Sequence, residues 1–161
     1  MTARTELIDL MGQLKLIGMK GQLDDILGRG RKRQRPVEEI LSELLKAEVA
    51  DKRMRSIRYQ LGIAKLPLAK ELSDFAFDDT PIDHALIEEL ASGAFLAQQR
   101  NVVLIGGTGT GKSHLAIAIA RACIRDGAKG RFFNVVDLVN ALEAESKSDR
   151  PGRMADALTR V

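Results

Sequence analysis

Residues 106–113 read GGTGTGKS and constrain the fold of this chain more than any other segment. They fit the pattern G-x-x-x-x-G-K-[ST], in which glycines let the backbone approach an anion closely. In such a loop the backbone N–H groups converge on a β-phosphate, the lysine reaches the β- and γ-phosphates, and the serine hydroxyl binds Mg²⁺. The residues that the pattern predicts to do this are Gly106, Gly107, Gly109, Gly111, Lys112 and Ser113.

The residues on both sides of the loop have the order that a phosphate-binding loop requires. Residues 101–105 form a short β-branched apolar run, typical of a buried parallel strand. Residues 114–124 predict a helix that is apolar almost all round, as in helices packed between a sheet and another layer. Residues 131–135 predict a second strand, and Asp137 can cap a helix that runs to about Glu145. We therefore expect an α/β fold with a P-loop NTPase core.

The N-terminal part of the chain predicts helices instead. Apolar residues at three- and four-residue spacing indicate a first helix over about residues 7–17, which Gly18 and Gly21 interrupt. A short helix follows, and a long one is expected at about 36–60. Residues 28–35 between them hold five basic residues and two glycines and predict a mobile loop, because like charges repel. One stripe of the long helix is expected to pack against its neighbours: Ile40, Leu44, Ala47, Ala50, Met54, Ile57 and Leu61.

Charge is divided unevenly along the chain. Residues 1–70 hold 15 Lys and Arg and 9 Asp and Glu, a net charge of +6, whereas residues 71–161 hold 10 and 13, a net charge of −3. A basic surface in the first part could meet nucleic-acid phosphates or could be a solvated face. Contacts to phosphates would make DNA binding fall steeply with salt. The predicted DNA contacts are Arg31, Lys32, Arg33, Arg35, Lys52, Arg53, Arg55 and Arg58.

Several classes of protein are excluded by composition. No apolar run reaches 18 residues, so no membrane span is expected, and the acids Glu6 and Asp9 argue against a secretory signal. The single cysteine, Cys123, cannot form an intramolecular disulfide and lies in an apolar helix, where a packing role is expected. These features fit a cytoplasmic protein. The expected domains are a basic helical region at 1–66, a linker at 67–82, and the first part of the P-loop domain at 83–161.

Taken in order, these motifs resemble the IstB-like transposition helper ATPases of the AAA+ class, which are related to the bacterial replicative helicase loader. The resemblance covers nearly the whole chain, and only the glycine loop is specific when taken alone. The segments that carry it are 14–19 (LKLIGM), 38–58, 66–67, 72–77 (LSDFAF), 90–93 (LASG), 111–116 (GKSHLA), 132–133 and 137–139.

The resemblance implies ATP and Mg²⁺ as ligands, DNA and a transposase as partners, and ATP-dependent self-association. It also implies that Thr108 and Thr110 add backbone donors to the loop. A helicase-loader-like replication ATPase is an alternative from the same architecture. A second alternative is a truncated module that binds ATP and DNA without hydrolysing ATP.

Hydrolysis requires groups that position Mg²⁺ and the attacking water. In the family that the chain resembles, acidic residues at the end of an apolar strand do this, and the chain has no such run after Gly111. Asp137 and Glu143 are the nearest acids, and no arginine finger has a candidate. AAA+ sheets also place two further strands between the first two. We therefore expect a domain truncated before the acidic strand, poorly soluble when expressed alone, with no catalytic residue in this chain.

Three residues around the loop have two interpretations each. His114 could contact the nucleotide or a neighbouring subunit, or it could be an exposed or locally bonded residue of the first helical turn. Phe75 and Phe77 could line the base pocket or could anchor the linker. The residues alone favour the second interpretation in both cases.

Overall fold

The computed structural model describes residues 2–78, 80–147 and 152–159. The chain forms two compact units, Met1–Arg58 and Tyr59–Val161, which we call unit 1 and unit 2. Helix α3 begins in unit 1 and ends in unit 2. The helices are α1 (Ala3–Gln13), α2 (Ile17–Lys32), α3 (Val37–Ala64), α4 (His84–Ala91), α5 (Ala94–Ala97), α6 (Lys112–Arg125), α7 (Val135–Ser146) and α8 (Arg153–Thr159), with a short 3₁₀ helix η1 (Leu72–Asp74).

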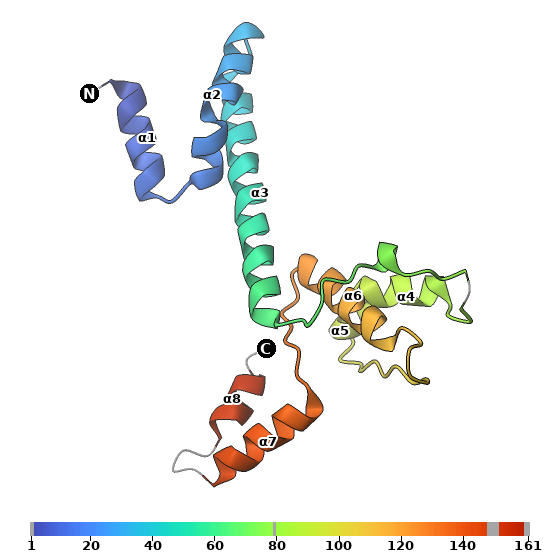
Figure 1. The fold of residues 1–161 in the computed structure, drawn as a ribbon. Coiled ribbons are helices and arrows are strands. Elements are labelled where there is room, and N and C mark those ends of the chain that lie inside the picture. Colours follow the sequence, from blue (N-terminus) through green and yellow to red (C-terminus); the bar gives the residue numbers. More distant parts are fainter. Residues whose placement is uncertain (1, 79, 148–151, 160–161) are drawn as a thin grey trace. The chain divides into compact units, whose positions relative to one another are not determined.

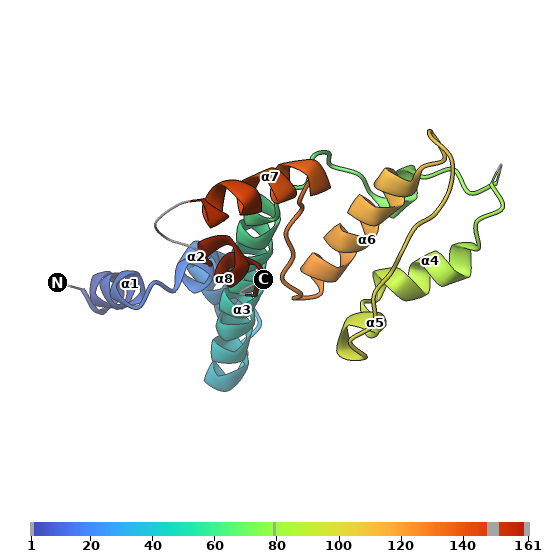
Figure 2. The same cartoon turned by 90° about the horizontal axis from the view of Figure 1, so that it is seen from below.

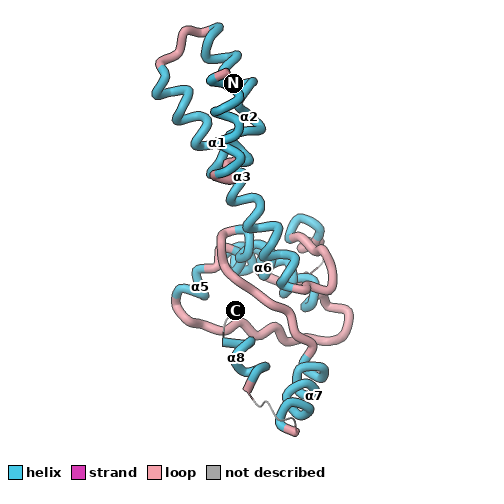
Figure 3. The backbone as a smooth tube through the Cα atoms, turned by 90° about the vertical axis from the view of Figure 1, so that its left-hand side faces the viewer, coloured by secondary structure: helices cyan, strands magenta, loops and turns pink. Residues whose placement is uncertain are grey.

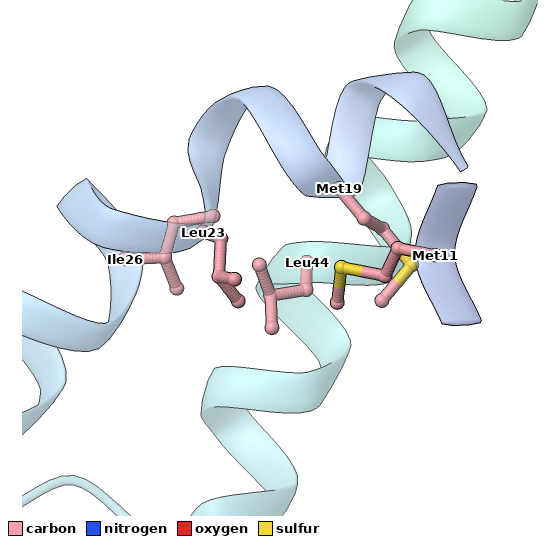
Figure 4. Close-up of a cluster of buried hydrophobic side chains, with 5 residues drawn as sticks. All are labelled: Met11, Met19, Leu23, Ile26 and Leu44. Carbon is pink, nitrogen blue, oxygen red and sulfur yellow. The ribbon is translucent and has the colours of Figure 1, made fainter. Parts of the chain in front are cut away.

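Unit 1 is built from α1, α2 and the first part of α3. Its core is a small cluster contributed by all three helices, in which Leu44 lies between Leu23 and the two methionine side chains (Figure 4). Ile8, Leu16, Leu27, Ile40 and Ala47 pack around this cluster. The buried members are Met11, Met19, Leu23, Ile26 and Leu44.

Helix α2 is longer than the sequence predicts. The segment 28–35, with its five basic residues, was expected to form a mobile loop, but α2 continues to Lys32 and includes both Gly28 and Gly30. The reason is contact with α3: a Cβ on Gly30 would lie 2.5 Å from Ile40 Cδ1. Gly18 was expected to interrupt the first helix, but α1 already ends at Gln13 and Gly18 lies inside α2. Its missing side chain lets α2 approach the backbone of α3, since a Cβ there would lie only 2.6 Å from Ala47 O. The expectation of a loop here is wrong.

The start of α2 is completed by a residue of α3. Leu16 precedes the helix and offers no side-chain cap. The carboxylate of Glu48, only 3% exposed, accepts a hydrogen bond of 3.1 Å from the N–H of Met19 instead. A negative charge at this position also complements the positive end of the helix dipole. The close packing of α2 on α3 and the capping of α2 therefore both depend on residues 47–48 of α3.

Unit 2 packs short helices around α6. Ile87 of α4 and Leu115, Ile119 and Cys123 of α6 form its buried cluster, and α4 and α6 lie side by side (Figures 1 and 2). Cys123 is buried there, and burial raises the pKa of its thiol, which agrees with the packing role expected from the sequence. The N-caps follow ordinary helix chemistry: Asp83 caps α4, and Asn134 rather than Asp137 caps α7.

The expectation of an α/β fold is wrong for the described residues, which contain helices and loops but no strand (Figure 3). Residues 101–105 have no helix or strand assigned, and Val103 and Ile105 are 77% and 91% exposed. The N–H of Phe132 donates to Ala64 O at the end of α3, 2.7 Å away, rather than to a neighbouring strand. A β-branched sequence gives a segment strand propensity, but a strand exists only when a partner supplies its hydrogen bonds.

Candidate nucleotide-binding site

The predicted loop, residues 106–113, leads directly into the N-terminus of α6. Gly109 and Gly111 have φ angles of +79° and +83°, the left-handed region that glycine tolerates best. Gly111 is the residue before the helix and has no side chain with which to cap it. Leu115 N–H is the first amide to bond back, to Gly111 O at 2.9 Å. The amides of the first turn, Lys112 to His114, therefore point out of the helix end, where an anion can accept from them.

Lys112 folds back over this loop. Its Nζ donates to Gly107 O and to Thr110 Oγ1, the latter at 3.3 Å. The Thr110 hydroxyl in turn donates to Gly107 O at 2.9 Å. The loop thus has a closed shape held by its own side chains, with the ammonium group at its mouth. Ser113, the predicted Mg²⁺ ligand, is exposed in the first turn of α6.

These features fit a bound polyphosphate. An uncapped helix end, left-handed glycines and a lysine over the loop together supply the donors and positive charge that phosphate oxygens require. A hydroxyl beside them is the ligand that Mg²⁺ uses in such loops. The fit concerns the phosphates and the metal ion, since these are the groups that the arrangement can recognise.

Phe75 packs against the end of the loop. A Cβ on Gly111 would overlap Phe75 Cε2, so the ring occupies the space that a side chain at residue 111 would need. The Phe75 ring also makes edge contacts with Phe77, at 4.8 Å between centroids, and with His114, at 5.3 Å. Both phenylalanines belong to the apolar cluster around α6. They anchor the linker, as the residues alone favoured.

Glu71 fixes the linker to α6. Its carboxylate forms ion pairs with Arg121, at 2.7 Å, and Arg125, at 2.5 Å, one turn apart on the helix. Its carbonyl oxygen lies 2.9 Å from His114 Nε2. Hydrogen bonding to Arg125 and then to Arg121 holds the pKa of the Glu71 carboxyl below its ordinary value, although partial burial opposes the shift. Glu71 raises the pKa of Arg125 in return.

The role of Glu71 was not predicted from the sequence. A usable signal existed, because Arg121 and Arg125 are spaced by four residues on a helix that is otherwise largely apolar. Such a pair indicates an acidic partner nearby. The interpretation of His114 as an exposed or locally bonded residue is wrong, because its ring contacts a residue 43 positions earlier in the chain.

A hollow of about 800 Å³ opens beside the loop in unit 2. Lys112 and Ser113 lie at its edge, and apolar residues such as Pro67, Val102 and Ile117 line much of the rest. Its volume is in the range of small-molecule sites. Lys112 supplies positive charge at the edge next to the loop, and Arg100, Lys129 and Arg131 also line the hollow.

The eight basic residues predicted to contact DNA fall into two groups. Arg35 is ion-paired with Glu39, at 3.0 Å, and with Glu43, and hydrogen bonding to Glu43 raises the pKa of Arg35. Arg55 is paired with Asp51, at 2.7 Å, and reaches Glu48. Arg55 is itself exposed, and Lys52 lies 3.9 Å from Glu48. The other six residues are exposed at the end of α2 or on α3: Arg31, Lys32, Arg33, Lys52, Arg53 and Arg58.

No helix in the part of the chain that the structure describes combines the length and apolar character needed to cross a membrane.

Comparison with known proteins identifies the family. The model of the IstB-like ATP binding proteins matches residues 9–161. The chain belongs to this family. A protein named for ATP binding in insertion sequence IS5376 of Geobacillus stearothermophilus is 36% identical over 121 residues, which cover 74% of this chain and 47% of that protein.

Two further relatives of the family carry similar names. The ATP-binding protein of insertion sequence IS21 from Pseudomonas aeruginosa is 30% identical over 96% of this chain and 58% of its own length. An IS21-like ATP-binding protein of Bacteroides fragilis is 30% identical over 90% of this chain and 73% of its own length. The chain thus spans about half the length of the first two relatives.

Proposed function

We propose that this chain binds ATP through residues 106–113 and acts as an accessory protein of DNA transposition for an insertion sequence. The observation that carries the proposal is the uncapped N-terminus of α6 behind Gly111, with Lys112 held over the loop. Family membership and the names of the relatives favour ATP over other polyphosphates and favour insertion-sequence transposition as the setting.

Within this proposal each loop residue has a role. The amides of residues 107–113 and the Lys112 ammonium bind the β- and γ-phosphates. The Ser113 hydroxyl binds Mg²⁺, which screens the phosphate charge when it is bound. Lys112 leaves Gly107 O for the phosphates, because an anionic acceptor forms a stronger hydrogen bond than a carbonyl does.

The proposal also assigns different binding functions to two parts of the chain. Residues 83–161 hold the nucleotide, and residues 1–66 meet DNA and a transposase. The exposed cations at the end of α2 are the best placed to meet DNA phosphates, since the guanidinium groups of Arg35 and Arg55 are already paired with carboxylates.

Titration with ATP and Mg²⁺ tests the central claim. Lys112→Ala should weaken ATP binding by about tenfold or more, because a charge-assisted hydrogen bond contributes about 1.5–3 kcal/mol. Lys147→Ala, which removes a charge from an exposed position of unit 2, is the matched control and should leave affinity unchanged. Equal affinity for ATP in the wild type and in Lys112→Ala would refute the loop as the phosphate site.

Partner capture tests the setting in transposition. The chain should retain a transposase of an IS21-type insertion sequence and should not retain a replicative helicase. Retention of the helicase alone would instead support the helicase-loader function. Retention of neither protein would refute the partner assignment, whereas ATP binding is tested separately by the titration.

A further inference from the structure

Helix α3 has a second apolar stripe, on a side turned away from the core of unit 1. Leu41, Leu45 and Val49 are 50%, 50% and 67% exposed, which is unusual for three large apolar residues spaced by four along one helix. Ile40 and Leu44, which pack into the core, each precede a member of this stripe by one residue and so lie about 100° away round the helix. We call Leu41, Leu45 and Val49 the outer stripe.

The outer stripe lines a groove of about 620 Å³ with charged residues near its two ends. Glu38 lies at the start of the groove, and Arg53 lies at the other end. Lys52, on the same face of α3, is 61% exposed and lies 3.9 Å from Glu48. The groove is therefore acidic at one end and basic at the other, and between these ends the outer stripe lies beside Ser42, Lys46 and Ala50.

These positions are symmetric about Leu45. Leu41 and Val49 lie four residues to either side, about 6 Å along the axis, and Glu38 and Lys52 lie seven residues to either side, about 10.5 Å. A two-fold axis through Leu45 would place Leu41 of one copy against Val49 of the other, twice. The same axis would place Glu38 of each copy against Lys52 of the other. Such an interface is self-complementary, as a two-fold contact must be.

We propose that two copies of this chain pair antiparallel through the outer stripe of α3, with Leu45 on the two-fold axis. The charges select the direction, because a parallel pair would bring Glu38 against Glu38 and Lys52 against Lys52. The pairing uses no residue of the nucleotide loop, so it needs no ATP. It also places Lys52 in the interface, so pairing and DNA contact at this residue exclude one another.

Sedimentation equilibrium of the full chain without nucleotide tests the pairing. A monomer–dimer equilibrium is expected, and Leu45→Glu should weaken it by about tenfold or more, because two carboxylates would then meet in an apolar contact. Asp25→Lys on the exposed face of α2 is the control for a charge change and should leave the equilibrium unchanged. A wild-type chain that stays monomeric over the measured concentrations, or a dimer unaffected by Leu45→Glu, would overturn the proposal.

A charge exchange tests the direction and register. Glu38→Lys and Lys52→Glu should each weaken the homodimer, because each places like charges opposite one another. Mixing the two variants should restore pairing as a heterodimer, since position 38 of each copy then faces an opposite charge at position 52. Circular dichroism shows whether each variant remains helical. Helical variants that fail to pair when mixed would contradict this register.

Crosslinking provides a test that does not depend on charge. In a Cys123→Ala background, Leu45→Cys should oxidise to a disulfide-linked dimer, because residues on a two-fold axis meet their own copies. Glu38→Cys should not, because its copies would lie about 21 Å apart along the axis. Efficient crosslinking at residue 38 and none at residue 45 would refute the antiparallel arrangement.

Discussion

At the scale of single residues, Gly111 combines two requirements that are separate elsewhere in the chain. Its φ angle of +83° favours glycine on conformational grounds, and the Phe75 ring occupies the space of a side chain. Gly127 has a φ angle of +103°, but a Cβ added there would meet nothing within 4 Å. A comparison of the two glycines therefore separates the effect of backbone strain from the effect of steric conflict.

Substitution of these glycines should give unequal effects. Gly127→Ala should cost about 1 kcal/mol of unfolding free energy, because a side chain in the left-handed region is strained. Gly111→Ala should cost more and should also lower ATP affinity, because Phe75 or the loop must move. Thermal denaturation and nucleotide titration measure both effects. Equal stability loss in the two variants would show that the Phe75 contact has no energetic weight.

At the same scale, the loop pattern predicted where a phosphate can bind but not which residue packs against it. The glycine and lysine positions are fixed by the geometry of the anion, so they could be read from spacing alone. Phe75 and Glu71 act through contacts across 36 to 54 positions of sequence, and no local pattern identifies the partner in such a contact.

At the scale of secondary-structure elements, α2 owes its position to glycines that the sequence suggested would break it. Gly18 lies against the backbone of α3, whereas a Cβ added at Gly21 would meet nothing within 4 Å. Glycine therefore permits close packing at position 18, whereas at position 21 it only lowers helix propensity.

Alanine at these two positions should shift stability in opposite directions. Gly21→Ala should stabilise the chain by about 0.5–1 kcal/mol, because alanine has the higher helix propensity. Gly18→Ala should destabilise it, because a Cβ would lie 2.6 Å from Ala47 O and the backbone cannot yield as a side chain does. Denaturant unfolding followed by circular dichroism compares them. A stabilising Gly18→Ala would contradict the close approach of α2 and α3.

The Glu71 contacts with α6 predict a dependence of stability on pH. The Glu71 pKa is lower in the folded chain than in the unfolded chain, so its contribution is complete above the unfolded pKa, about 4.3, and is lost as pH falls through the folded pKa. Glu71→Gln should cost about 1 kcal/mol at pH 7, a modest amount because the partner Arg125 is 45% exposed.

The difference in melting temperature between wild type and Glu71→Gln should therefore shrink as the pH falls from about 5 to about 3. Glu143→Gln, on the exposed surface of α7, is the control. A difference that stays constant over this range would mean that the Glu71 charge contributes nothing.

Helix positions could be predicted well where the apolar pattern is long. The expected helix at about 36–60 is α3, and the expected helix at 114–124 lies within α6. The expected loop at 28–35 is largely helix, because contact between Gly30 and Ile40 outweighs the repulsion of nearby arginines. Tertiary contact overrides local propensity in this case, and it could not be read from the sequence.

At the scale of the whole molecule, the positive charge of the N-terminal part is only partly available to a partner. Arg35 and Arg55 are committed to carboxylates of α3, whereas Lys32 and Arg33 are exposed at the end of α2. The net charge read from the sequence therefore overstates the positive surface available for DNA.

Two double variants with equal charge change compare these groups. Lys32→Ala with Arg33→Ala should weaken DNA binding and reduce the slope of log affinity against log salt by about 1.8, because two phosphate contacts are lost. Arg35→Ala with Arg55→Ala should reduce it less. Fluorescence anisotropy over a salt series measures both. Identical slopes in the two variants would assign binding to overall charge rather than to the end of α2.

The sequence also predicted two strands that the described residues do not contain. Residues 101–105 and 131–135 have the right side chains, but neither segment finds a hydrogen-bonding partner of the same kind. Strand propensity is a property of a single segment, so it could be predicted from composition. Sheet formation requires several segments to pair, so composition could not predict it.

The bond between Glu48 and the Met19 amide joins residues 29 positions apart. Until α3 lies in place, α2 begins with unsatisfied N–H donors and contains two glycines near its start. As a separate helix, α2 is therefore unstable. Formation of α2 therefore waits on a contact that only the assembled unit provides. In exchange with deuterated solvent, the Met19 amide should open only when the three helices separate together, which makes it a reporter of the cooperative unfolding of unit 1.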